Sequence, residues 1–80
     1  MTLDELLKAI GTELSRATMM HHAMHGPHEG YAVILEEVDE LWDLVRKYPK
    51  RASVGDMREE AIQIAAMAAR FVLDVCEDKP

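Results

Sequence analysis

Apolar residues recur every three or four positions along three stretches of this 80-residue chain. That period is typical of an α-helix that buries one face, and no stretch shows the alternation of a half-buried strand. Two breaks, at residues 25–27 and 49–54, separate the stretches, because proline cannot continue a helix. The sequence therefore predicts an all-α fold with three helices, over residues 3–23, 27–48 and 54–77.

Local signals mark the starts of these helices. Thr2 and Glu5 have the spacing of a capping box, in which each side chain binds a free backbone N–H group. Ser53 and Asp56 have the same spacing before the third helix. Pro27 suits the first turn of the second helix, where its missing N–H group has no consequence. All three starts are thus predicted independently of the apolar pattern.

The chain is long enough for a single domain, residues 1–80, with a small core. Chains this short commonly gain stability from disulfides, a metal or a partner subunit, and the single Cys76 excludes an internal disulfide. We therefore expect a homo-oligomer, at least a dimer, in which three-helix protomers complete a four-helix-bundle-like assembly. The first helix and the Ala-rich middle of the third, residues 65–69, are the expected contact.

Charge and composition exclude several classes of protein. A net charge of -6 argues against nucleic-acid binding, which needs a basic face. No segment approaches the roughly 18 apolar residues of a membrane span, and the amino terminus does not resemble a signal peptide. A single cysteine suits a reducing compartment. We expect a cytoplasmic protein without membrane or nucleic-acid partners.

Acidic residues cluster within two of the predicted helices. Glu37 and Glu40 lie three residues apart on one helical face, with Glu36 beside them, and Glu60 and Gln63 repeat this spacing. If the two helices pack antiparallel, these pairs converge on one point and offer oxygen ligands to a hard cation such as Mg²⁺. The same spacing is equally typical of a solvated face. Spacing alone leaves both interpretations open.

The pattern Glu37-x-x-Glu40 followed by Glu60-x-x-Gln63 resembles the E-x-x-E…E-x-x-D signature of the MazG-like all-α nucleoside triphosphate pyrophosphatases. The surrounding runs, residues 28–42 and 58–68, look like small MazG-like proteins of phages and mobile elements. The resemblance implies a MazG-type assembly, a homodimer or homotetramer, and Mg²⁺ held by these four residues. It also implies hydrolysis of a (d)NTP to (d)NMP and pyrophosphate, in a role such as cleaning the nucleotide pool.

Gln63 departs from the family pattern, which has Asp at this position. A Gln carbonyl can bind Mg²⁺ but brings no charge and cannot act as a base. The alternative function is therefore a catalytically weak or silent nucleotide-binding accessory or sensor protein. Glu36, beside the expected ligands, is our candidate for the catalytic residue that positions or deprotonates the attacking water.

Three further residues are candidates for substrate binding. Arg70 lies two turns beyond Gln63 and would either reach a phosphate or pair with Asp74. Lys47 belongs to a basic patch after the second helix that would contact phosphate or remain solvated. Trp42 would stack on a base, although packing in the core or at a subunit contact is favoured for it.

Four histidines surround the first break: His21, His22, His25 and His28. Their spacings of three and four are those of a transition-metal site. A helix end and the Gly26-Pro27 break intervene, however, and no cysteine lies near. We therefore favour surface or capping roles over a position near the nucleotide or a dedicated zinc or nickel site.

Overall fold

The computed structural model describes residues 1–77 and contains three long helices joined by short loops. Helix α1 spans Leu3–Met20, α2 spans Pro27–Lys47 and α3 spans Val54–Phe71. A π-helical turn, η1, covers Val72–Cys76 and replaces the end of the regular helix predicted up to residue 77. No strand occurs in this part of the chain. The predicted all-α, three-helix fold is confirmed.

The capping boxes predicted for α1 and α3 are both present. The Thr2 hydroxyl accepts the Glu5 N–H at 3.1 Å, and the Glu5 carboxylate accepts the Thr2 N–H at 3.0 Å. Ser53 and Asp56 exchange the same two hydrogen bonds at the start of α3. Pro27 is the first residue of α2, as expected. Local chemistry therefore sets all three helix starts.

Helix α1 ends at Met20, earlier than predicted, because the backbone that follows bonds to α3 and η1. The Arg70 guanidinium donates to the His22 carbonyl at 2.7 Å, and the Met24 N–H donates to the Asp74 carboxylate at 3.0 Å. A continued helix would direct these groups along its own axis. The loop between α1 and α2 is thus fastened to the carboxyl end of α3.

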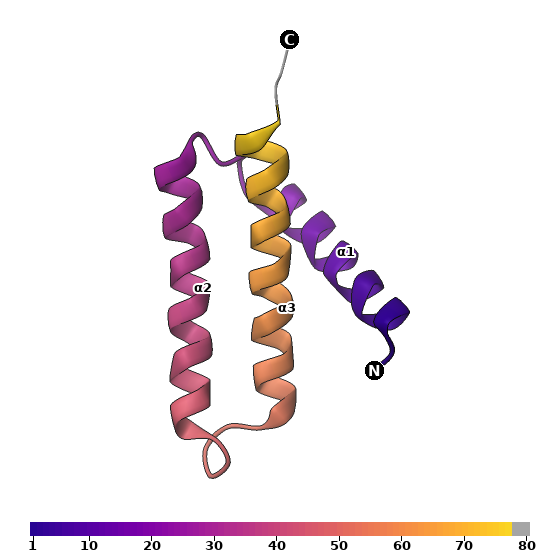
Figure 1. Ribbon diagram of the computed structural model, residues 1–80, viewed down its shortest axis with the longest axis vertical. Coiled ribbons are helices and arrows are strands. Elements are labelled where there is room, and N and C mark those ends of the chain that lie inside the picture. Colours follow the sequence, from indigo (N-terminus) through magenta and orange to yellow (C-terminus); the bar gives the residue numbers. More distant parts are fainter. Residues whose placement is uncertain (78–80) are drawn as a thin grey trace.

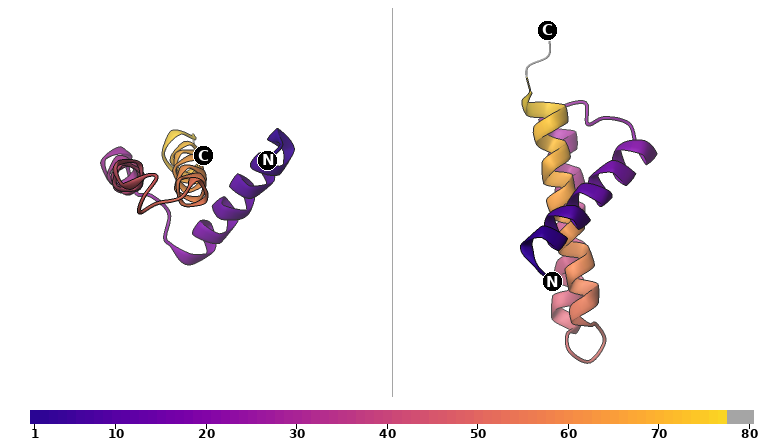
Figure 2. Two further views of the ribbon diagram at one scale, coloured as in Figure 1. Left: turned by 90° about the horizontal axis from the view of Figure 1, so that it is seen from below. Right: turned by 90° about the vertical axis from the view of Figure 1, so that its right-hand side faces the viewer.

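Helix α3 lies between the other two helices (Figure 1). α2 and α3 form an antiparallel hairpin along the long axis of the molecule, and α1 crosses the opposite side of α3 obliquely (Figure 2). Gly30 permits close contact between α2 and the end of α3, since a Cβ atom there would lie 2.5 Å from the Phe71 ring. The small core contains Ala17, Ala66 and Met67, flanked by Leu14, Val33 and Ile34.

Much apolar surface stays exposed in the single chain. The radius of gyration of the chain is 13.7 Å, whereas a compact domain of this length has about 12 Å. The accessible area of the chain is 5888 Å², against roughly 4900 Å² for a folded monomer of this mass. A row of exposed side chains at alternating spacings of four and three, here named the α2 stripe, follows α2: Tyr31, Leu35, Val38, Trp42 and Val45.

This arrangement bears on two expectations about packing. Within the chain, Ala66 of the Ala-rich segment of α3 lies in one buried cluster with Ala17 of α1, and these residues are 0% and 1% exposed, whereas Ala68 is exposed. Small side chains at positions 17 and 66 let the two helices approach closely. The subunit contact expected at this segment stays a prediction. Trp42 is 63% exposed, so it does not pack in the core of the chain.

Within residues 1–77, none of the helices combines the length and the apolar character needed to cross a membrane.

Candidate metal centre

Three glutamates from α2 and α3 converge within the helical hairpin. One carboxylate oxygen from each of Glu37, Glu40 and Glu60 lies within 4.8 Å of the others. Glu37 and Glu40 share a face of α2 because they are three residues apart. Glu60 meets them from the first half of α3, which runs antiparallel to α2. Three of the four residues predicted as metal ligands are thus brought together.

Glu60 is the buried member of this carboxylate cluster. It is 8% exposed, and its Oε1 atom, like Oε2 of Glu37, is buried without a hydrogen-bond partner among the described residues. Burial, together with the neighbouring carboxylates of Glu37 and Glu40, raises the pKa of Glu60 to about 8. Without a metal, Glu60 therefore keeps a proton at neutral pH.

The cluster borders a strongly acidic hollow of about 480 Å³. Besides Leu44, only acidic side chains line it: Glu36, Asp39, Glu40, Asp43 and Glu60. Among residues 1–77, no ion pair joins Glu37, Glu40 or Glu60 to a basic side chain. Buried oxygens without partners and uncompensated carboxylates are the donor set of a hard cation such as Mg²⁺. The residues present fit this ion.

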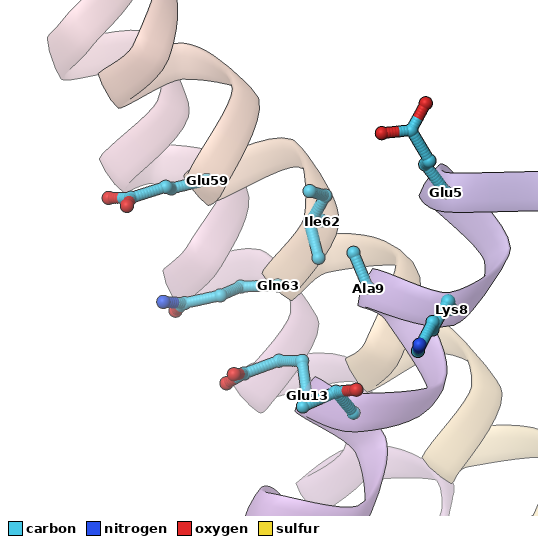
Figure 3. Close-up of a pocket in the computed structure, with 8 residues that line it drawn as sticks. Glu5, Lys8, Ala9, Glu13, Glu59, Ile62 and Gln63 are labelled. Atoms are coloured by element: carbon cyan, nitrogen blue, oxygen red, sulfur yellow. The ribbon is translucent and has the colours of Figure 1, made fainter. Parts of the chain in front are cut away.

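Gln63, the fourth predicted ligand, lines a different cavity. Gln63 is three residues beyond Glu60 and is therefore offset from it by about 60° around α3. It borders an open groove of about 700 Å³ between α1 and α3. Figure 3 shows its side chain extending in the same direction as those of Glu59 and Glu13. Gln63 thus lines the α1–α3 groove and not the acidic hollow.

The carboxylates that line this groove are better compensated than those of the carboxylate cluster. Glu5 is committed to the cap of α1, and the Glu13 carboxylate accepts a hydrogen bond from Arg16 at 3.0 Å. Lys8 contributes a positive charge to the lining. These contacts satisfy the Glu5 and Glu13 carboxylates, so that Glu59 is the one acidic side chain of the lining without a hydrogen-bond or ion-pair partner among residues 1–77.

The remaining predicted site residues occupy separate places. Glu36 is exposed and lines the acidic hollow beside Glu40. Lys47 binds the Asp43 carboxylate at 2.6 Å at the end of α2. Trp42 belongs to the α2 stripe. Of these residues, only Glu36 lies at the hollow as expected of a catalytic group.

Arg70 is 5% exposed and serves mainly as a structural link. Besides the His22 carbonyl, it contacts the Asp74 carboxylate at 3.9 Å, which confirms the pairing weighed from the sequence. It also borders a cavity of about 350 Å³ that Glu36 and Glu37 share. A phosphate in that cavity would meet a guanidinium that is already engaged.

Asp39 and Asp43 were not chosen as site residues from the sequence, yet both line the acidic hollow. Their signal was present, because Glu36, Asp39, Glu40 and Asp43 follow one another at spacings of three, one and three. That spacing keeps all four on one side of α2. Asp43 is partly neutralised by Arg46 and Lys47, whose hydrogen bonds lower its pKa.

No protein-family model, curated protein or solved structure matches this chain. The resemblance to MazG-like pyrophosphatases stays a prediction from the sequence.

Proposed function

We propose that this chain is a Mg²⁺-dependent nucleoside triphosphate pyrophosphohydrolase, which converts a (d)NTP to a (d)NMP and pyrophosphate. The observation that carries the proposal is the convergence of Glu37, Glu40 and Glu60, with buried carboxylate oxygens that have no partner. The reaction class comes from the sequence resemblance. The metal requirement follows from the charge of the cluster.

The acidic hollow should bind a cation first, because a nucleotide without a bound cation would be repelled. A triphosphate carries several negative charges, and the five acidic side chains of the lining would repel it. Bound Mg²⁺ would neutralise phosphate charge and orient a water molecule for in-line attack. Glu36 is exposed at the hollow, where its carboxylate could accept a proton from water.

The proposed assembly contains a second copy of the chain on the α2 stripe. Tyr31, Leu35, Val38, Trp42 and Val45 recur on average every 3.5 residues, which is the repeat that pairs two helices along a common seam. The excess surface of the single chain is consistent with a missing partner. A contact there brings α2 helices from two copies together and builds a bundle from two helical hairpins.

A pyrophosphate-release screen over canonical and modified dNTPs with Mg²⁺ tests the activity. Glu40→Gln keeps the size of the side chain but removes a ligand charge, so we expect it to lower turnover at least about 100-fold. Glu59→Gln is the matched control, because Glu59 lies on the α1 side of α3 and should retain activity. Equal rates in both variants, or no pyrophosphate release from any dNTP, would contradict the proposed reaction.

A second candidate function is a silent nucleotide sensor or accessory protein. It is favoured by Gln63, which supplies no charge and faces the α1–α3 groove. Gln63→Asp restores the family signature and should increase pyrophosphate release strongly if the natural chain only binds nucleotide. Calorimetry then separates the candidates, since a sensor retains Mg²⁺-dependent nucleotide binding without turnover.

A further inference from the structure

A second group of metal-binding side chains lies at the α1–α2 loop. One donor atom from each of His22, His25 and Glu29 lies within 4.8 Å of the others. Nδ1 of His22 is 3.7 Å from Oε1 of Glu29, and Nδ1 of His25 is 3.7 Å from Oε2. The two imidazole rings stack with centroids 4.7 Å apart. Each carboxylate oxygen therefore faces a different ring.

We propose that His22, His25 and Glu29 bind a transition-metal ion of the Zn²⁺, Co²⁺ or Ni²⁺ class. A nitrogen–oxygen distance of 3.7 Å is too long for a hydrogen bond. Ligand atoms around a tetrahedral ion, with bonds of about 2.0–2.1 Å, lie roughly 3.3–3.4 Å apart. Each of the two nitrogen–oxygen distances must shorten by a few tenths of an ångström to reach this spacing, and the stacked rings must turn until both nitrogens point at one ion.

The loop is held in place independently of the metal. The buried Arg70 fixes the carbonyl of His22, and Asp74 fixes the N–H of Met24 between the two histidines. The His25 N–H also donates to Glu29 at 3.3 Å. A metal therefore meets a loop that is already ordered, which lowers the entropic cost of binding.

One contact competes with the metal. Nδ1 of His22 donates a hydrogen bond to the Ala23 carbonyl at 2.7 Å, and coordination through this nitrogen replaces that bond. The neutral ring then carries its proton on Nε2.

This site differs from the carboxylate cluster in chemistry and in position. Imidazole nitrogens favour Zn²⁺, Co²⁺ and Ni²⁺, whereas carboxylates alone favour Mg²⁺ and Mn²⁺. Glu29 and Glu37 are eight residues apart on α2, about 12 Å along its axis. The proposal does not rest on the proposed pyrophosphohydrolase activity. All three side chains reach solvent, which leaves coordination positions for water.

Titration of the metal-free full chain with Co²⁺, followed by visible absorption, tests the site, and calorimetry with Zn²⁺ gives its stoichiometry. We expect one ion per chain at this site. Loss of a direct ligand in His25→Ala or Glu29→Gln should weaken binding at least about tenfold. His28→Ala is the matched control for histidine content, and Glu60→Gln controls for the carboxylate cluster. Both controls should retain the Co²⁺ spectrum.

Histidine ring NMR gives a second readout that a general structural effect would not reproduce. Zn²⁺ should shift the ring signals of His22 and His25 and leave those of His28 in place. Equal affinity in His25→Ala and His28→Ala would overturn the proposal. So would binding that is lost in Glu60→Gln but kept in His25→Ala, because the ion would then occupy the carboxylate cluster. Absence of binding in the wild-type chain would also exclude the site.

Discussion

Replacing Glu60 with glutamine should remove most of the change in stability between about pH 5 and pH 8. The pKa of Glu60 is raised from 4.5 to about 8 by burial and by its two carboxylate neighbours. Between these values the folded chain binds one proton that the unfolded chain has released. The free energy of unfolding therefore falls as the pH rises through this window.

The size of the effect follows from the shift. Each pKa unit corresponds to about 1.4 kcal/mol, so a change from 4.5 to about 8 corresponds to roughly 5 kcal/mol. A chain of this length has a total stability of only about 4–12 kcal/mol. The wild-type protein should thus be most stable below about pH 4.5 with respect to this group. It should lose this contribution as the pH approaches 8.

Thermal unfolding followed by circular dichroism, from about pH 5 to pH 9 in EDTA, measures this slope. Glu60→Gln stays neutral and its amide can still donate to Glu37 and Glu40, so its melting temperature should vary less. The exposed Glu59→Gln should behave like the wild type, and both keep the histidines that titrate in the same range. Identical slopes in the two variants would refute the reasoning.

Magnesium should oppose the loss of stability because it binds the ionised cluster. At a concentration ten times its dissociation constant, Mg²⁺ would stabilise the folded chain by about 1.4 kcal/mol. The gain should be larger at about pH 8.5 than at pH 6, since protons compete with the ion. Glu60→Gln should gain less. A pH-independent effect of Mg²⁺, equal in both proteins, would place the ion elsewhere.

Three further predictions concern packing. Gly30→Ala should destabilise the chain by about 1–2 kcal/mol in urea unfolding, because its Cβ would overlap the Phe71 ring. The control Gly11→Ala has open space around it and should stabilise the chain by about 0.5–1 kcal/mol. Trp42→Glu should shift sedimentation toward the monomer, and an unchanged sedimentation coefficient would remove the α2 stripe as the contact. Arg70→Met should lower the free energy of unfolding by about 2–4 kcal/mol, since it leaves the backbone and carboxylate partners of the guanidinium unpaired. A decrease below about 0.5 kcal/mol would contradict the linking role of Arg70.

The helices were predictable because their signals are local. Capping boxes at Thr2 and Ser53 and a proline at position 27 depend on neighbours within three residues. The early end of α1 was not predictable, because it depends on Arg70 and Asp74, about 50 residues further along the chain. The residues near the end of α1 carry no signal of hydrogen-bond partners so far along the chain.

Helical spacing predicts which residues of the carboxylate cluster lie together on one helix, but no more. Three-residue spacing places Glu37 beside Glu40, but it cannot say which face of α3 meets them. The structure answers this with Glu60, and the offset of Gln63 follows from its position around the same helix. The sequence disfavours a metal site at the histidines because a helix end and the Gly26-Pro27 break lie among them. A break disrupts helical spacing but does not prevent a loop from folding back onto Glu29.

The two faces of α2 allow metal binding and self-association to be separated. At about 100° per residue, the mean direction of the α2 stripe lies about 150° from that of Glu37 and Glu40. A second copy on the stripe would therefore leave the cluster uncovered. Stability effects at sites that share no partners usually add, so Trp42→Glu should leave the stabilisation by saturating Mg²⁺ unchanged. A double variant with Glu60→Gln that departs from additivity would show that the partner copy completes the metal site.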